Sequence, residues 1–157
     1  MRQAGLQKRR GPSYLQSMPD SSPPLGSAIR VLLADDHRLF AESLMRVLSE
    51  DERVDVVGIA ENGEQAVDLA LELQPDVILM DLMMPVMDGL EATRRIRGSG
   101  LHSQILLLTG TETPVGPDDA TAAGATAFLR KERGVEELRQ VFLQVASLAA
   151  LLGATAR

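Results

Sequence analysis

The 157-residue chain contains no cysteine, no tryptophan and only two histidines, His37 and His102. The missing thiols exclude disulfide frameworks, cysteine nucleophiles and thiolate zinc sites, and two imidazoles are too few for a multi-histidine metal centre. Aromatic residues make up only 3% of the chain, so its core must consist of Leu, Val, Ile, Met and Ala. No run approaches the roughly 18 apolar residues that a membrane-spanning helix needs. We therefore expect one globular domain that does not associate with membranes.

Positive charge is also scarce, because 22 acidic residues oppose 16 basic ones and give a net charge of -6. An acidic surface repels phosphate backbones, so we expect no direct binding of nucleic acid by this chain. Residues 1–28 differ from the rest, with a net charge of +3 against -9 for the remainder. They are rich in Gly, Pro and Ser and show no apolar periodicity. We expect a disordered extension over 1–28, a single domain over 29–152 and a short tail over 153–157.

From residue 29 onward, short apolar runs alternate with segments of helical periodicity. The runs are typical of buried parallel strands, and the segments between them repeat apolar residues every three or four positions. This alternation predicts an α/β fold, a doubly wound five-stranded parallel sheet of order 2-1-3-4-5 with helices on both faces. The fourth helix is expected from Asp118, after a segment rich in Pro and Gly, and the last helix is expected to end near Leu152. The expected strands are 29–34, 54–60, 77–80, 105–108 and 127–129.

Polar residues stand where these apolar runs stop: Asp35 and Asp36 after the first, Asp81 after the third, Thr109 after the fourth and Lys131 after the fifth. Sites in open parallel sheets lie beyond the carboxyl ends of the strands, so we expect these residues to converge. Carboxylates 4 Å apart repel by roughly 4 kcal/mol a pair at an effective dielectric near 20, so the cluster must protonate, spread apart or bind a cation. Hard oxygen ligands favour Mg²⁺. A carboxylate beside Mg²⁺ and a lysine is also suited to attack a phosphoryl group.

Three stretches of the chain resemble the receiver domains of bacterial two-component response regulators. They are residues 31–37, which read Val-Leu-Leu-Ala-Asp-Asp-His, residues 76–89, which contain Met-Asp-Leu-Met-Met-Pro, and residues 123–131, which end in Lys. The resemblance covers about residues 29–150. The Asp-Asp-His start is similar to the subfamily whose members carry a helix-turn-helix output domain. Because no such domain follows here, a single-domain regulator and the receiver of a longer protein both remain open.

The resemblance implies a role for each residue of the site. Asp81 is implied to be the phosphoacceptor, and Thr109 and Lys131 are implied to contact the phosphoryl group. Thr109 is also implied to act as a switch residue together with Phe128. The implied Mg²⁺ ligands are the acidic pair, the phosphoacceptor and one backbone carbonyl: Asp35, Asp36, Asp81 and Met83.

By the same resemblance, the chain is a cytoplasmic signalling switch and not a turnover enzyme. A sensor histidine kinase would donate a phosphoryl group to Asp81 with Mg²⁺ bound, and the domain would assist only its own phosphorylation and dephosphorylation. The face built from the fourth helix, the fifth strand and the last helix would then change a partner contact or a homodimer contact. Where an output domain is attached, the switch would regulate transcription.

Three other functions fit the sequence less well. A phosphatase of the haloacid dehalogenase type needs a second Asp two residues after its nucleophile, where this chain has Met83. A flavodoxin-like nucleotide-binding domain would have a Gly-rich loop after the first strand, where this chain has Asp35 and Asp36. A receiver that binds a protein partner without being phosphorylated is the remaining alternative, and it is disfavoured because all the key positions are filled.

Overall fold

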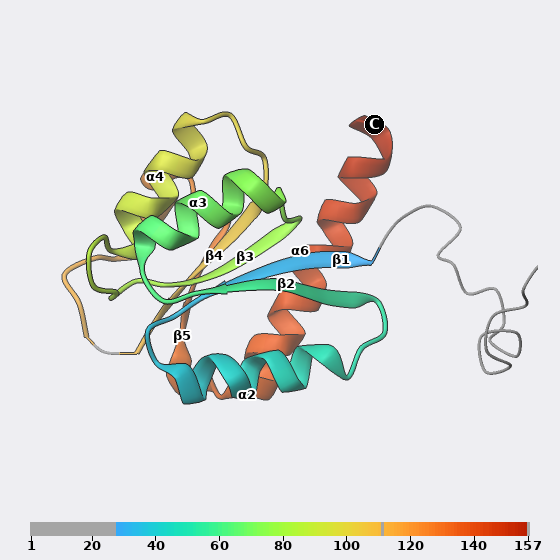
Figure 1. Cartoon of the computed structure of the whole chain (residues 1–157), viewed down its shortest axis with the longest axis horizontal. Helices are drawn as coiled ribbons and strands as arrows, with labels where there is room; N and C mark the ends of the chain where they lie inside the picture. The colour runs from blue at the N-terminus through green and yellow to red at the C-terminus, as the bar shows by residue number, and fades with distance from the viewer. Residues whose placement is uncertain (1–27, 111, 157) are drawn as a thin grey trace, which may run out of the picture.

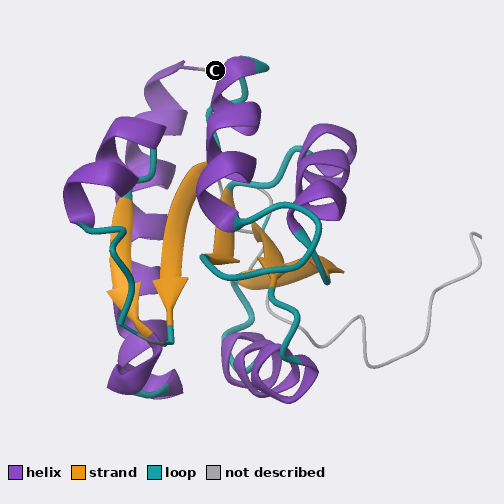
Figure 2. Ribbon diagram, turned by 90° about the vertical axis from the view of Figure 1, so that its left-hand side faces the viewer, coloured by secondary structure: helices purple, strands orange, loops and turns teal. Residues whose placement is uncertain are grey.

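The structure is a computed structural model that describes residues 28–110 and 112–156. The extension expected over 1–28 therefore lies outside the described residues, apart from its last position. A five-stranded parallel sheet forms the centre of the domain, with helices on both faces (Figures 1 and 2). The strand order is β2-β1-β3-β4-β5, which confirms the predicted topology.

Strands and helices alternate along the chain, as the apolar pattern predicts. The strands are β1 (Ile29–Ala34), β2 (Val54–Ala60), β3 (Val77–Asp81), β4 (Gln104–Thr109) and β5 (Ala127–Arg130). The helices are α2 (Arg38–Ser49), α3 (Gly63–Leu73), α4 (Gly89–Gly98), α5 (Pro117–Ala123) and α6 (Val135–Ala156), with a 3-10 turn η1 (Lys131–Arg133) between β5 and α6.

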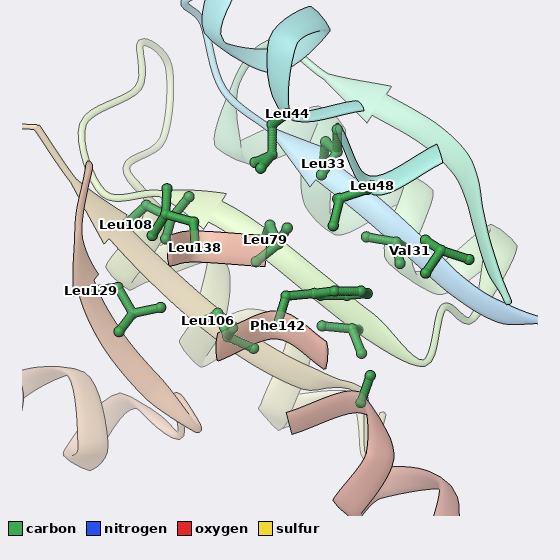
Figure 3. Close-up of a cluster of buried hydrophobic side chains, with 13 residues drawn as sticks. Val31, Leu33, Leu44, Leu48, Leu79, Leu106, Leu108, Leu129, Leu138 and Phe142 are labelled. Atoms are coloured by element: carbon green, nitrogen blue, oxygen red, sulfur yellow. The ribbon is translucent and has the colours of Figure 1, made fainter. Parts of the chain in front are cut away.

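Two hydrophobic clusters hold the helices against the two faces of the sheet. Successive side chains of a strand point to opposite faces, so each strand contributes to both clusters. One cluster joins the strands to α2 and α6, with Phe142 fully buried in it (Figure 3). The other joins them to α3, α4 and α5. All five residues of β3 are buried, as expected for the central strand.

The register of the strands places the polar residues at one edge of the sheet. Ala34 of β1 pairs with Met80 of β3, so the residues that follow them, Asp35 and Asp81, lie side by side. Asp81 in turn pairs with Leu108 of β4. Local sequence and strand pairing together therefore bring the chemistry to the carboxyl ends of the central strands.

Two helix boundaries differ from the prediction. The fourth helix begins at Pro117, not Asp118, because proline is well suited to the first turn and Asp119 accepts a hydrogen bond from the Gly116 N–H at 2.9 Å. The last helix runs to Ala156 instead of ending near Leu152, since one glycine inside a helix costs only about 1 kcal/mol. Within residues 28–110 and 112–156, no helix has the length and apolar character needed to cross a bilayer.

Candidate functional site

The carboxyl edge of the sheet holds a buried ion-pair cluster. Lys131, the first residue of η1, places its Nζ 2.5 Å from Asp35 Oδ2 and 3.3 Å from Asp81 Oδ2. The side chains of Asp35 and Asp81 are only 6% and 3% exposed, and that of Lys131 is 12% exposed. Charged groups this deeply buried must be paired or must bind a further ion. The sequence prediction that these three side chains converge is confirmed.

Asp36 and His37 form the open side of the same cluster. Asp36 is 36% exposed and His37 is 73% exposed, and the imidazole Nδ1 lies 3.4 Å from Asp35 Oδ1 and 3.4 Å from Asp36 Oδ1. One ligand atom from each of Asp35, Asp36, His37 and Asp81 lies within 4.8 Å of the others. Three carboxylates against one ammonium leave an excess of negative charge. Oxygen donors of this kind fit a hard divalent cation such as Mg²⁺.

Burial also changes the acidity of Asp81. The loss of solvent, together with the negative charge of Asp35, raises the pKa of Asp81 to about 6. The ammonium of Lys131 and a backbone hydrogen bond from Met83 oppose this rise without cancelling it. A divalent cation beside Asp81 would lower its pKa again and favour the ionised, nucleophilic form. Met83 itself is 59% exposed, and the predicted role of its carbonyl as a metal ligand stays a prediction.

An aromatic ring completes the surroundings of the lysine. The Nζ atom of Lys131 lies 4.4 Å from the centroid of the Phe40 ring, within the range of a cation–π interaction. Phe40 belongs to the first turn of α2, which follows the acidic pair in the chain. The sequence showed Phe40 only as one apolar position of a helix, so its contact with a residue far along the chain was missed.

The loop after Asp81 depends on a glycine. The Gly89 N–H donates to the Leu82 carbonyl at 2.8 Å. A Cβ atom at this position would overlap the carbonyl of Asp81, so no other residue fits without moving the phosphoacceptor candidate. Asp88 accepts a hydrogen bond from the Glu91 N–H at 2.8 Å and thereby caps α4.

The same loop contains a strained residue. Val86 has a φ of 70°, which β-branched side chains rarely adopt, and its side chain is 76% exposed. Its neighbour Met87 accepts a hydrogen bond from the Gly63 N–H at 3.0 Å. That bond fixes the loop to the start of α3. The loop beside Asp81 is therefore held in shape from both ends.

The two predicted switch residues lie next to the site, on the side of β5. Thr109 is the last residue of β4, is 4% exposed and stands one position beyond the residue paired with Asp81. Phe128 is half-buried in β5, and both residues line a surface hollow in front of α5. This placement agrees with a connection between the acidic cluster and the α5–β5 surface. Their roles in switching stay predictions.

Known proteins are similar to this chain in sequence. The family model described as response regulator receiver domain matches residues 31–143. The response regulator GacA of Pseudomonas aeruginosa is 41% identical over 117 residues, which cover 74% of this chain and 55% of that protein. The transcriptional regulatory protein NarL of Mycobacterium tuberculosis is 36% identical over 125 residues, which cover 80% of this chain and 58% of that protein.

Solved structures agree with the sequence relatives. The signal receiver domain of NarL from Mycobacterium tuberculosis superposes with a TM-score of 0.72 at 35% identity, covering 78% of this chain and 98% of that one. A LuxR-family response regulator from Aurantimonas gives a TM-score of 0.71 at 31% identity, covering 77% of this chain and 86% of that one. The chain spans a little over half the length of the curated relatives GacA and NarL. With the acidic cluster, the strand order and the match over residues 31–143 in agreement, the chain belongs to the response regulator receiver domain family.

Proposed function

We propose that this domain is a phosphorylation-controlled switch in which Asp81 accepts a phosphoryl group from a sensor histidine kinase. The observation that carries the proposal is the position of Asp81 Oδ2, 3.3 Å from the ammonium of Lys131 and beside the carboxylates of Asp35 and Asp36. A nucleophile, a fixed positive charge and oxygen ligands for a cation share one edge of the sheet. Phosphoryl transfer to a carboxylate needs these three components.

The transfer forms one bond and breaks one. A carboxylate oxygen of Asp81 attacks the phosphorus atom, and the bond between phosphorus and the kinase histidine breaks, with its electron pair returning to the imidazole. The product at Asp81 is an acyl phosphate. Mg²⁺ held by oxygens of Asp35, Asp36 and Asp81 would neutralise charge on the transferred group. Lys131 supplies a second positive charge, 3.3 Å from Asp81 Oδ2.

The new group would act on the rest of the domain through Thr109 and Phe128. A phosphoryl group on Asp81 offers acceptor oxygens to the Thr109 hydroxyl, and Phe128 would move into the space that Thr109 leaves. The surface made of α5, β5 and α6 would then favour a different partner or a homodimer. In this proposal the domain promotes only its own phosphorylation and hydrolysis, so it is not a turnover enzyme.

The setting of the switch is proposed from its relatives. GacA is named a response regulator and NarL a transcriptional regulatory protein. We therefore place this domain in the cytoplasm, where it would regulate transcription through an output domain in the same or a partner protein. The chain itself is not proposed to bind nucleic acid.

Intact-mass spectrometry after incubation with acetyl phosphate tests the proposal. The wild-type protein should gain the mass of one phosphoryl group with Mg²⁺ and none with a chelator, and Asp81→Asn should gain none. Asp88→Asn is the matched control, because it removes a nearby carboxylate while Asn still caps α4, and it should be phosphorylated normally. No gain by the wild type, with acetyl phosphate or with a kinase, would favour the phosphorylation-independent binding module instead.

A further inference from the structure

His37 directly follows Asp35 and Asp36 in the chain and belongs to the acidic cluster. It is the N-cap residue of α2, but its side chain makes no capping hydrogen bond. Its backbone N–H instead donates to Asp35 Oδ1 at 2.8 Å, and its Nδ1 lies 3.4 Å from both Asp35 Oδ1 and Asp36 Oδ1. The imidazole therefore lies beside the carboxylates and makes no capping hydrogen bond to α2.

The spacing of these atoms is close to that of a metal coordination shell. In an octahedral shell, ligand atoms bound to an ion at about 2.1 Å lie about 3.0 Å apart when adjacent and about 4.2 Å apart when opposite. Here Nδ1 is 3.4 Å from two carboxylate oxygens, and the four ligand atoms from Asp35, Asp36, His37 and Asp81 lie within 4.8 Å of one another. Small rotations of exposed side chains are enough to close this difference, because His37 is 73% exposed.

Lys131 does not compete for the oxygen atom nearest to the imidazole. Its ammonium contacts Asp35 Oδ2, whereas His37 faces Asp35 Oδ1. Oδ2 of Asp35 therefore contacts the lysine, whereas Oδ1 lies on the side of Asp36 and His37. An ion on that side would have a nitrogen ligand as well as oxygen ligands.

A nitrogen ligand changes which ions a site prefers. Mg²⁺ is bound by oxygen atoms and retains water, so an imidazole adds little to its affinity. Zinc and the other late first-row divalent ions bind imidazole well, and their affinity for a mixed nitrogen and oxygen site exceeds that for the earlier ions. We propose that His37 is a nitrogen ligand that makes this pocket bind Zn²⁺ and related late first-row ions in competition with Mg²⁺.

The proposal deepens the proposed function, since the same carboxylates would hold Mg²⁺ for phosphoryl transfer. Zinc binding itself requires no phosphoryl group, so the two can be tested separately. In an environment with free zinc, a site of this kind would exchange its Mg²⁺ for an ion that binds more tightly. The occupancy of the pocket would then depend on the ratio of the two metals.

The two histidines of the chain provide a variant and its matched control. His37→Asn removes the nitrogen ligand and places a good capping residue at the start of α2, so folding should not suffer. His102→Asn removes the other imidazole, which is exposed in the loop before β4, at the opposite edge of the sheet. Urea unfolding of both variants would verify that their stability is unchanged.

Calorimetric titration of each protein with Zn²⁺ and with Mg²⁺ tests the proposal. We expect His37→Asn to bind Zn²⁺ at least about tenfold more weakly than the wild type, His102→Asn to bind it equally well, and all three to bind Mg²⁺ with the same affinity. In ¹⁵N-resolved spectra of the two imidazoles, Zn²⁺ should shift Nδ1 of His37 and leave His102 unchanged.

Each other outcome is decisive. Equal zinc affinity in His37→Asn and wild type, or an unshifted His37 imidazole at saturating zinc, would overturn the proposal. Phosphorylation of Asp81 would still support the proposed function in that case. If Zn²⁺ binding depends on His37 but Asp81 accepts no phosphoryl group, the proposed metal site stands. The proposed phosphorylation switch is then refuted.

Discussion

Replacement of Asp81 by asparagine should stabilise the protein in the absence of metal. In the folded protein the carboxylate of Asp81 is 3% exposed and faces the charge of Asp35, and these two effects raise its pKa from 3.8 to about 6. In the unfolded chain the same group is solvated and has an ordinary pKa. Asparagine has nearly the same shape and no charge, so it removes the cost of burying the anion and leaves the packing intact.

The sign and size of the effect follow from proton linkage. Because the folded state binds the proton more tightly than the unfolded state, the free energy of unfolding falls as the pH rises through the window from 3.8 to about 6. A difference of about two pKa units corresponds to roughly 3 kcal/mol, and this net shift already includes the opposing attraction of Lys131. We expect the variant to be more stable by about 1–3 kcal/mol at pH 7.5 and equal to the wild type below about pH 3, where the carboxyl is protonated in both states.

Urea unfolding at several pH values, with a chelator present, measures this difference. Asp88→Asn serves as the control, since it changes a carboxylate that caps α4 and should show no such gain at pH 7.5. Saturating Mg²⁺ should reduce the difference in unfolding free energy between the variant and the wild type. A cation that binds the folded state stabilises the wild type more than the variant. A variant less stable than the wild type at pH 7.5, or a difference that does not depend on pH, would refute the reasoning.

Three further predictions test other parts of the structure by urea unfolding. Phe142→Ala should cost about 3–5 kcal/mol because the ring is fully buried, whereas Leu148→Ala on the exposed side of α6 should change stability by less than about 0.5 kcal/mol; similar losses for the two would contradict the packing described. Val86→Asn should gain about 1 kcal/mol, since asparagine tolerates a φ of 70° better than valine, and a loss would show that the valine is not strained. A double-mutant cycle of Phe40→Leu with Lys131→Met should give a coupling energy of about 0.5–2 kcal/mol, and a value of zero would exclude the cation–π contact.

The sequence predicted the architecture well because its signals are local and strong. Each strand is a run of apolar residues bounded by polar ones, and the strand order follows from general rules of connection. The predictions fell short at the ends of the elements: Gln104 belongs to β4 and Arg130 to β5, but the apolar runs leave them out because they are polar. Strand ends are set by backbone hydrogen bonds between neighbours, which hydrophobicity does not report.

The site was predicted in outline and missed in detail. The convergence of Asp35, Asp36, Asp81 and Lys131 follows from the geometry of parallel strands, and the structure confirms it. The ring of Phe40 beneath Lys131 was not predicted, since a helical apolar pattern does not say which distant side chain a residue will contact. The positive φ of Val86 was also missed, because valine gives no sign of such a conformation.

The ion pair between Lys131 and Asp35 joins residues that are 96 positions apart in the chain. During synthesis β1 and its two aspartates are made long before Lys131, which directly follows β5, the strand that pairs with β4. An incomplete or cleaved chain therefore has the acidic residues without the ammonium. The complete ion-pair cluster therefore forms only when β1, β3 and β5 have all taken their places in the sheet.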